Sequence, residues 1–307
     1  MTRSDLALPS WREGTTRDAL LTFLEASASL APDDRVATFD NDGTLWCERP
    51  AYLQLLFFVD ALQRAAELDP SLRARPEFAA VLSNDQAAIG ELGLARVGMA
   101  LNGLFAGLTP EAFSAAAREF VDRAVHPVLG LPARRTVYQP MLELIDALRE
   151  HGFSVFVVSG GGTEFVRAVS HDLYGVPPEG VVGTLVQHEM VRRADGGPEL
   201  RRTNLLDGDA NEGVAKVTRI QSHLGRRPVF AAGNSGGDRE MLEWATSGEG
   251  PSLALVIDHD DAEREFAYQG RAESFAEAEA ITEVAARLGW TVASIANDWA
   301  TVFSSAD

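Results

Sequence analysis

The chain is poor in two residue types that often carry chemistry: it has one cysteine, Cys47, and one lysine, Lys216, among 27 basic residues. A single cysteine excludes an internal disulfide and is typical of a reducing compartment. All other basic residues are arginines, so this chain uses arginine wherever any cation would serve. Because an ammonium and a planar guanidinium are not interchangeable at a tight anionic site, the lone lysine is a candidate functional residue. The alternative is one leftover surface lysine on a helix.

Excess basic charge and long hydrophobic runs are also absent. The formal net charge of −18 argues against non-specific binding to nucleic acids or anionic membranes, both of which need basic surface. It leaves an anionic small molecule open as a ligand, because a local cation and a few donors can override the global field. No run approaches the roughly 20 apolar residues that span a bilayer, and residues 1–17 have no apolar core of signal-peptide length. The sequence therefore favours a soluble cytoplasmic protein with no nucleic-acid or membrane partner.

The 307 residues are enough for one large domain with an insertion or for two domains. A first helix is predicted over residues 17–31. Residues 46–135 carry almost no strand signal and predict helices over 52–68, 86–104 and 111–124, the last opened by Thr109 as N-cap. Helices and strands then alternate, with segments at 139–150, 154–158, 163–173, 181–186, 212–224, 229–232, 253–257, 276–288 and 290–295, and a hairpin tip or loop at 192–211. This alternation predicts an α/β fold with a three-layer, mainly parallel sheet.

The most informative stretch is an apolar run that ends in Asp40-Asn41-Asp42-Gly43-Thr44. Side chains two apart on a strand share a face, so Asp40 and Asp42 start on the same side. They lie at the carboxyl end of a predicted strand, where ligands bind in open α/β sheets. Two carboxylates there can bind a divalent cation, or divide the roles of nucleophile and general acid/base. The alternative is a turn rich in aspartate that closes the strand.

Three further elements follow in the chain. The strand at 154–158 ends in Ser159 and three glycines before a helix, and glycines with a helix start let the backbone approach an anion closely. Lys216 lies on the predicted helix over 212–224. The strand at 229–232 ends in Gly233-Asn234, with Asp238 four residues later. Taken alone, the last of these would be a flexible surface turn as readily as a site.

In this order, the four elements resemble the motifs of the haloacid dehalogenase-like (HAD) hydrolases over about residues 35–260, closest to the phosphoserine phosphatase branch with its helical cap. The resemblance implies a Rossmann-like core domain made of residues 1–45 and 136–307. It also implies that residues 46–135 form an all-helical cap domain, which closes over the carboxyl ends of the strands.

The resemblance also implies roles for individual residues. Asp40 would be the nucleophile that forms an aspartyl-phosphate, and Asp42 the general acid and base. Ser159 and Lys216 would hold the phosphoryl oxygens. The residues implied to contact substrate are Gly43, Thr44, Glu48, Gly160 and Gly161. Mg²⁺ is the implied cofactor, and its implied ligands are Asp40, Asp42, Asn234 and Asp238.

Two features depart from the family pattern. Asn234 stands where an aspartate is usual; an amide oxygen can still ligate a hard cation, but it brings no charge. Which of Asn234 and Asp238 touches the metal is left open. Glu48 lies one residue from the register at which phosphoserine phosphatases place a glutamate on the substrate amine, and a solvated charge pair with Arg49 is the alternative.

Other residues near these motifs have two interpretations each. Trp46 either lines the leaving-group pocket or packs at the hinge into the cap. Residues 258–261, Asp-His-Asp-Asp, follow a strand and either reach the edge of the site or form a polar loop, and the polar loop is the prediction. The six histidines show no ligand-like spacing, and we expect them at the surface or satisfied in the core.

The resulting hypothesis is a Mg²⁺-dependent phosphatase that hydrolyses a small-molecule phosphate monoester. An acid at position 42 favours phosphate chemistry, because dehalogenases of the family lack it. The cap contains no lysine of the kind used in phosphonate cleavage. The alternatives are phosphotransfer to an acceptor alcohol and a non-catalytic module that binds a phosphometabolite. The sequence fixes neither the phosphate ester nor the oligomeric state.

Overall fold

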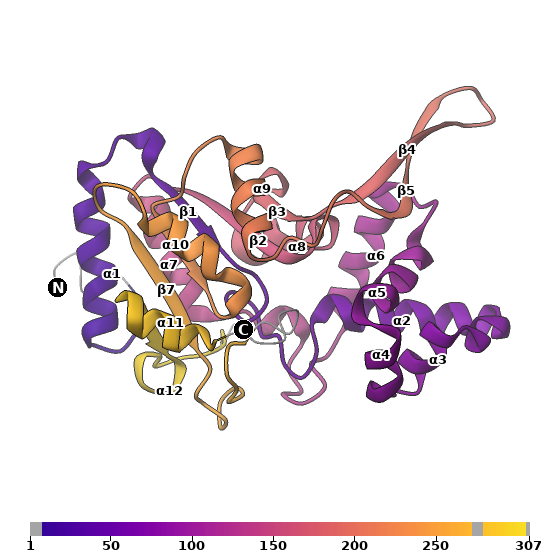
Figure 1. Cartoon of the computed structure of the whole chain (residues 1–307), viewed down its shortest axis with the longest axis horizontal. Helices are drawn as coiled ribbons and strands as arrows, with labels where there is room; N and C mark the ends of the chain where they lie inside the picture. The colour runs from indigo at the N-terminus through magenta and orange to yellow at the C-terminus, as the bar shows by residue number, and fades with distance from the viewer. Residues whose placement is uncertain (1–7, 272–278, 305–307) are drawn as a thin grey trace.

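A six-stranded sheet forms the centre of the molecule (Figure 1). The computed structural model describes residues 8–271 and 279–304. The strand order is β3-β2-β1-β6-β7-β8, and neighbouring strands pair in parallel. The strands are β1 (Val36–Phe39), β2 (Ser154–Gly162), β3 (Val181–Thr184), β6 (Phe230–Gly233), β7 (Leu253–Asp258) and β8 (Thr291–Ser294).

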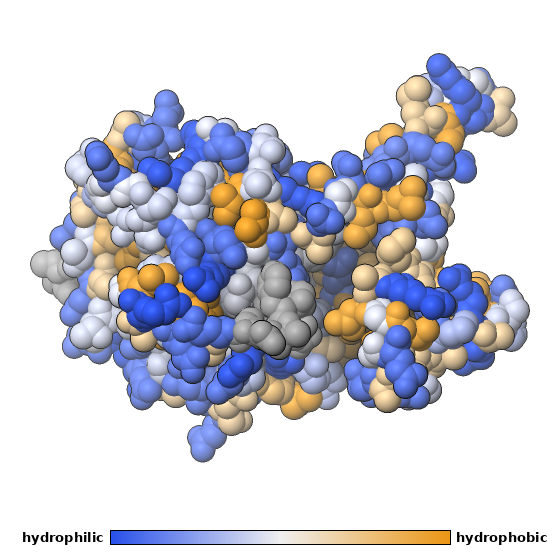
Figure 2. Space-filling model, in the orientation of Figure 1, coloured by the Kyte–Doolittle hydropathy of each residue, from blue (hydrophilic) through white to orange (hydrophobic). Residues whose placement is uncertain are grey.

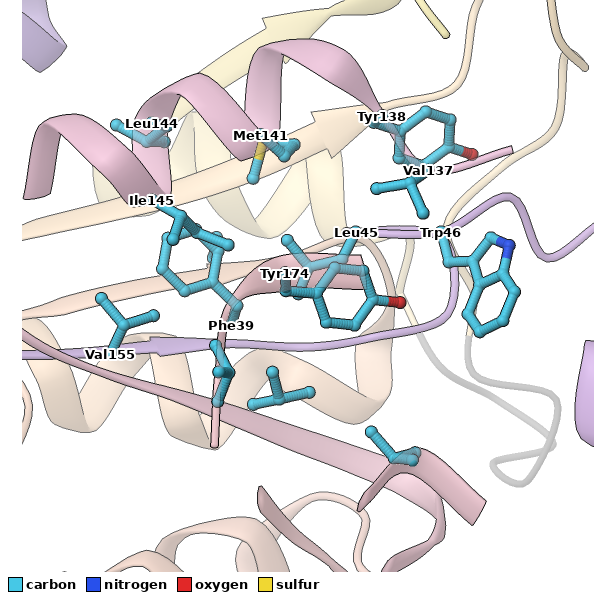
Figure 3. Packing of buried hydrophobic residues seen from close by; sticks show 14 of the residues in the cluster. Phe39, Leu45, Trp46, Val137, Tyr138, Met141, Leu144, Ile145, Val155 and Tyr174 are labelled. Atoms are coloured by element: carbon cyan, nitrogen blue, oxygen red, sulfur yellow. The ribbon is translucent and has the colours of Figure 1, made fainter. Parts of the chain in front are cut away.

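Helices cover both faces of this sheet. Alternate residues of β7 belong to two separate apolar clusters, because successive side chains of a strand point to opposite faces. On one face, helices α1 (Thr15–Ala26), α7 (Gln139–Glu150) and α8 (Thr163–Tyr174) contribute to the larger cluster. Figure 3 shows Met141 and Ile145 of α7 in this cluster with Phe39 of β1. The other face carries α9 (Val214–Leu224), α10 (Arg239–Thr246) and α11 (Ile281–Leu288). The predicted three-layer α/β fold is confirmed.

Between β1 and α7 the described residues form helices and no strand, as predicted. They are α2 (Leu53–Leu68), α3 (Pro76–Leu82), α4 (Gln86–Leu92), α5 (Leu94–Asn102) and α6 (Pro110–Arg123), with short 3-10 turns between some of them. Thr109 caps α6, since its hydroxyl accepts a hydrogen bond from the amide of Ala112 at 3.2 Å. These helices lie to one side of the sheet (Figure 1). Among the described residues, no helix is both long and apolar enough to cross a bilayer.

A hairpin tip or loop is predicted at 192–211: residues 193–197 are indeed the tip of a hairpin, but residues 198–206 form a strand instead of a loop. Strands β4 (Val186–Arg192) and β5 (Pro198–Leu206) pair antiparallel and form a projecting hairpin (Figure 1). In Figure 2 the hairpin projects from the molecule with hydrophilic and hydrophobic residues mixed on its visible surface. Most residues of both strands are exposed, so the alternation that marks a half-buried strand is missing from their sequence. Although the hairpin follows β3, its Arg202 is buried and donates to Asn102 of α5 at 2.8 Å. The guanidinium also lies 3.8 Å from the centre of the Phe113 ring of α6.

Several element boundaries differ from the predictions. Strand β2 continues through Gly162 instead of ending at residue 158, because Gly162 pairs with Thr184 of β3 past a register shift. The first helix ends at Ala26 and β3 ends at Thr184. The helix predicted over 276–288 is observed as α11 from Ile281; its first residues, 276–278, lie outside the described residues. A short final helix, α12 (Ile295–Asp298), follows β8.

Candidate active site

Asp40 lies directly after β1, the strand at the middle of the sheet, and is buried with an exposed fraction of 6%. Its amide donates to the carbonyl of Ala232 in β6 at 2.9 Å. This bond continues the β1–β6 ladder by one residue and fixes where the side chain starts. Burial, and after it the charge of Asp238, raises the pKa of Asp40 to about 8 against the opposing effect of Lys216.

Lys216, the single lysine, is 2% exposed and joins two of the predicted elements. Its Nζ lies 2.6 Å from Asp40 Oδ1 and 2.5 Å from Asp238 Oδ1, and it also donates to the carbonyl of Val158 in β2 at 3.0 Å. Burial by itself would lower the pKa of Lys216, but the charges of Asp238 and Asp40 outweigh burial and raise it. The ammonium is therefore charged. The interpretation of Lys216 as a leftover surface residue is wrong.

Asp42 and Ser159 face each other across the carboxyl ends of β1 and β2. Ser159 is fully buried and its hydroxyl hydrogen-bonds the Asp42 carboxyl. Burial raises the pKa of Asp42 above its ordinary value, although this bond and the charge of Lys216 oppose the shift. Asp42 is only half-buried by surface exposure, so a proton on it can still exchange with a bound molecule or with water.

The glycines after Ser159 lie within the extended end of β2. The Gly161 amide donates to Ser159 Oγ at 2.9 Å, and the Gly162 amide donates to Oε1 of Gln54 at 2.8 Å. Gln54 belongs to α2, so a side chain from the helical segment reaches the sheet here. A Cβ added at Gly161 would lie 3.0 Å from Gln54 Oε1 and 3.8 Å from Asp42 Oδ2, which places these groups around one point.

Asn234 and Asp238 follow β6, and their side chains have different environments. Asp238 Oδ1 bonds Lys216, and its Oδ2 accepts hydrogen bonds from the amides of Asn234 and Ser235 at 3.0 and 3.1 Å. The Asp238 carboxylate is thus used to order the loop and the lysine. Asn234 Oδ1 accepts only a long bond, 3.4 Å, from the hydroxyl of Thr44. Of the two residues, Asn234 has the oxygen less committed to protein donors.

Glu48 is buried, with an exposed fraction of 7%, so its interpretation as half of a solvated charge pair is wrong. Its Oε1 accepts a hydrogen bond from Asn234 Nδ2 at 3.1 Å. Burial raises the pKa of Glu48 to about 8, and the charges of Asp42 and Asp40 act in the same direction. The neighbouring Arg49 places its guanidinium over the ring of Tyr268, 4.5 Å from the ring centre.

Gly43 and Thr44, both predicted to contact substrate, are packed inside the turn after Asp42. Gly43 has a φ of +80°, and an added Cβ would lie 1.9 Å from Asn234 Nδ2 and 2.9 Å from the Glu48 carboxyl carbon. Only glycine fits this position. Thr44 is fully buried and directed at Asn234. The turn therefore brings Glu48 and Asn234 against the backbone that carries Asp42.

The loop after β7 also reaches this turn: for His259 the polar-loop prediction is wrong, and the alternative, that residues 258–261 reach the edge of the site, is what the structure shows. This histidine is 3% exposed, and its Nε2 lies 2.8 Å from the Gly43 carbonyl oxygen. Its Nδ1 lies 3.0 Å from Glu265, which also accepts hydrogen bonds from Tyr138 at 2.9 Å and from Cys47 at 3.2 Å. The position of residues 258–261 at a strand end was the one sequence signal for this contact.

Trp46 lies in the segment that leads from β1 to the first helix of the helical segment, α2, where it packs as a hinge residue. It is 2% exposed, and its Nε1 donates to Thr136 Oγ1 at 2.7 Å and to the Ala133 carbonyl at 3.0 Å. Both partners lie in the segment between α6 and α7, where the chain returns to the sheet. Its ring contacts Tyr174 edge-on, as Figure 3 shows. Trp46 thus connects the two segments that join the sheet to the helical segment, and the structure gives no support to its alternative as a pocket residue.

Comparison with known proteins identifies the family. The model of the haloacid dehalogenase-like hydrolases matches residues 37–243, more than half of the 307-residue chain. The chain belongs to the haloacid dehalogenase-like hydrolase family. The four predicted elements lie inside the matched range, whereas His259, Glu265 and Tyr268 of this family member lie beyond it. The comparison with curated proteins found no match.

Solved structures agree with this HAD fold. A functionally unknown protein from Anaerococcus prevotii DSM 20548 is 14% identical, with 95% of this chain and 94% of that one covered and a TM-score of 0.59. A protein of unknown function from Bordetella pertussis Tohama I is 18% identical, with 84% and 97% covered and a TM-score of 0.51. A phosphoserine phosphohydrolase-like protein from Francisella tularensis is 14% identical, with 83% and 99% covered and a TM-score of 0.42. At these identities the first two support the fold alone.

Proposed function

We propose that this HAD hydrolase is a Mg²⁺-dependent phosphatase that cleaves a small-molecule phosphate monoester through an aspartyl-phosphate. The observation that carries the proposal is the buried chain Asp40–Lys216–Asp238 at the carboxyl end of the central strand, with Asp42 and Ser159 beside it. It combines a positioned carboxylate, a fixed cation and a second acid, which are the groups that phosphoryl transfer requires.

Asp40 is the proposed nucleophile. Lys216 holds Oδ1, so the other carboxylate oxygen, Oδ2, attacks phosphorus in line with the leaving oxygen. The bond from phosphorus to the leaving alcohol oxygen breaks as the aspartyl-phosphate forms. Water then attacks the same phosphorus, and the Asp40 carboxylate and inorganic phosphate are released. The ammonium of Lys216 offsets the charge of Asp40 and of the phosphoryl oxygens during both steps.

Asp42 is the proposed proton carrier. Its raised pKa keeps a larger fraction of the carboxyl protonated near neutral pH than an exposed aspartate would have. It donates that proton to the leaving alcohol oxygen, and in the second step it accepts a proton from the attacking water. Ser159, buried within β2 and bonded to Asp42, is the proposed donor to a phosphoryl oxygen, together with the backbone at Gly160 and Gly161.

The donor set fits Mg²⁺. The available ligands are hard oxygens: Asp40, the backbone carbonyl of Asp42 and the amide oxygen of Asn234. Two of the acids, Asp40 and Asp238, share the Lys216 ammonium, and burial raises the pKa of Asp40 and of Glu48 to about 8, so a bound cation would favour the charged form of these groups. In the described ranges, no group of three or more His, Cys, Asp or Glu side chains is arranged to hold a metal ion; Lys216 lies between Asp40 and Asp238. The cation would supply charge neutralisation of the phosphoryl group.

The helical segment is the proposed source of substrate specificity. We propose that residues 46–135 act as a cap domain on a core made of residues 1–45 and 136–307. Gln54 of α2 already contacts the end of β2 beside Ser159. A leaving group bound over this point would lie between the sheet and the helices, shielded from water.

The test is phosphate release from a broad panel of phosphomonoesters, with Mg²⁺ and with chelator. Wild type is compared with Asp40→Asn and with Asp146→Asn, a matched change at an exposed position on α7. We expect metal-dependent release that is lost in Asp40→Asn alone. Addition of an acceptor alcohol tests whether the phosphoryl group is transferred to an alcohol. Formation of a phosphorylated alcohol, with a matching decrease in free phosphate, would identify a phosphotransferase. A folded protein that binds phosphate but turns over no substrate would support the binding-module alternative.

A further inference from the structure

Asn234 and Glu48 form a buried pair at the proposed cation site. They are 186 residues apart in the sequence, yet Asn234 Nδ2 lies 3.1 Å from Glu48 Oε1. Asn234 and Glu48 are 1% and 7% exposed, so bulk water does not compete for this hydrogen bond. The Thr44 hydroxyl donates to Asn234 Oδ1, which fixes the amide with its nitrogen toward Glu48. The orientation of this amide is thus set from both sides.

A carboxylate at position 234 would meet Glu48 directly. An aspartate is nearly the same size as asparagine, so one of its oxygens would lie where Nδ2 lies now, about 3 Å from Glu48 Oε1. Two buried carboxylates at that distance repel strongly, and one must stay protonated. An asparagine at 234 and a glutamate at 48 are therefore complementary. The position after β6 carries an amide, and the neighbouring turn after β1 carries the acid, Glu48.

The turn that carries Glu48 is the one that carries Asp42. Gly43 lies between them with both Asn234 and Glu48 in contact with its Cα, as the clashes of an added Cβ demonstrate. Arg49 is directed over the Tyr268 ring, so the adjacent guanidinium lies against an aromatic face. Glu48 lies near enough to Asp42 and Asp40 for their charges to act on its carboxyl group.

We propose that Glu48 supplies the carboxylate of the divalent-cation site that Asn234 does not, so that the charge at this site is carried by Asp40 and Glu48. The inference rests on the proposed function, because it concerns the same Mg²⁺. It assigns Asn234 the role of a neutral oxygen donor, oriented by Thr44 and by its hydrogen bond to Glu48.

The test is Mg²⁺ affinity of the full chain by titration calorimetry, without substrate. Glu48→Gln keeps an oxygen that can accept from Asn234 Nδ2 and removes only the charge, and we expect about tenfold weaker binding or more. The double variant Glu48→Gln/Asn234→Asp moves the acid to position 234, and we expect its affinity to return to within about threefold of wild type. Glu119→Gln, an exposed change on α6, is the matched control and should leave the affinity unchanged.

The outcomes separate this inference from the proposed function. Wild-type affinity in Glu48→Gln would overturn the inference alone, and the proposed phosphatase would stand. If Glu48→Gln instead raised KM only for substrates with an amine and left Mg²⁺ binding intact, Glu48 would be a substrate contact. No Mg²⁺ binding by the wild type would overturn both. The double variant guards against misfolding, because recovery of affinity requires a folded site.

Discussion

His259 holds the carbonyl of Gly43 at 2.8 Å, although 216 residues separate them. Its other ring nitrogen lies 3.0 Å from the Glu265 carboxylate. The imidazole thus lies between a carbonyl oxygen and a carboxylate oxygen, both of which are hydrogen-bond acceptors. This buried bridge ties the loop after β7 to the turn that carries Asp42, and four predictions follow from it and from the neighbouring contacts.

Replacement of His259 by phenylalanine should loosen this turn. Phenylalanine keeps the ring that stacks on Tyr268, with centroids 4.3 Å apart, but it loses both hydrogen bonds. We expect phosphate release to fall about 10- to 100-fold, as is usual when a residue that orients a ligand-bearing group is removed. Steady-state kinetics check this against His171→Phe, an exposed position on α8. Equal loss in both variants would mean that the contact with Gly43 is unimportant.

Glu265 should make the stability of the protein depend on pH at its acid side. Burial alone would raise the pKa of Glu265, but the hydrogen bond and charge of His259 and the bonds from Phe266 and Tyr138 outweigh it and lower the pKa. A lowered folded-state pKa gives stability that is present above the unfolded value, near 4.5, and is lost as the pH falls through the folded value. Glu265→Gln removes this contribution and should cost about 3 kcal/mol at neutral pH.

Urea unfolding between neutral pH and about pH 3 measures the difference between wild type and Glu265→Gln. The difference should be constant above the ordinary glutamate pKa and shrink below it. A difference that does not change with pH would show that Glu265 contributes packing and not charge.

Lys216→Met should damage both activity and stability. The variant leaves Asp40 and Asp238 buried without their shared cation, at a cost of about 3–5 kcal/mol. Lys216→Arg should fail to restore activity, because a planar guanidinium does not replace a compact ammonium between two carboxylates. Thermal unfolding and phosphate release are compared with Arg73→Met, an exposed change in the helical segment. Full activity in Lys216→Arg would contradict this assignment.

Gln54→Ala should affect substrate binding more than turnover. The change removes the acceptor of the Gly162 amide and the one contact described above from α2 to the end of β2. A lost hydrogen bond of this kind costs about 1–2 kcal/mol, so KM should rise about tenfold. Gln63→Ala, at an exposed position of the same helix, is the control. An unchanged KM with a lower kcat would instead assign Gln54 to the chemical step.

Local patterns were sufficient to predict the sheet and the residues at its edge. Asp40 and Asp42 were predicted from the period of two along a strand, and Lys216 from its isolation among arginines and its place before the last motif. The structure brings Asp40, Lys216 and Asp238 within hydrogen-bonding distance, and places Ser159 against Asp42. These residues meet because the carboxyl ends of parallel strands lie at one edge of a sheet.

The two strands of the hairpin β4–β5 could not be predicted in this way, although a hairpin tip was one of the two expectations for residues 192–211. Its residues are mostly exposed and polar, so no alternation marks the strands. Arg202 reads as one more surface arginine, yet it is buried because Asn102 and the Phe113 ring, about a hundred residues away in the chain, surround it. Such contacts leave no trace in a local window.

The sequence by itself determined the α/β alternation, the helical insertion and the order of the four motifs, because each depends on residues close together in the chain. Only the tertiary structure decided which polar groups are buried together. In the sequence, Glu48 looks solvated beside Arg49, but in the structure Asn234 lies against it. His259 looks like part of a polar loop, but in the structure it contacts the carbonyl of Gly43. The physical reason is that the protonation and role of a charged side chain depend on burial and on partners, and these are brought together from distant segments only on folding.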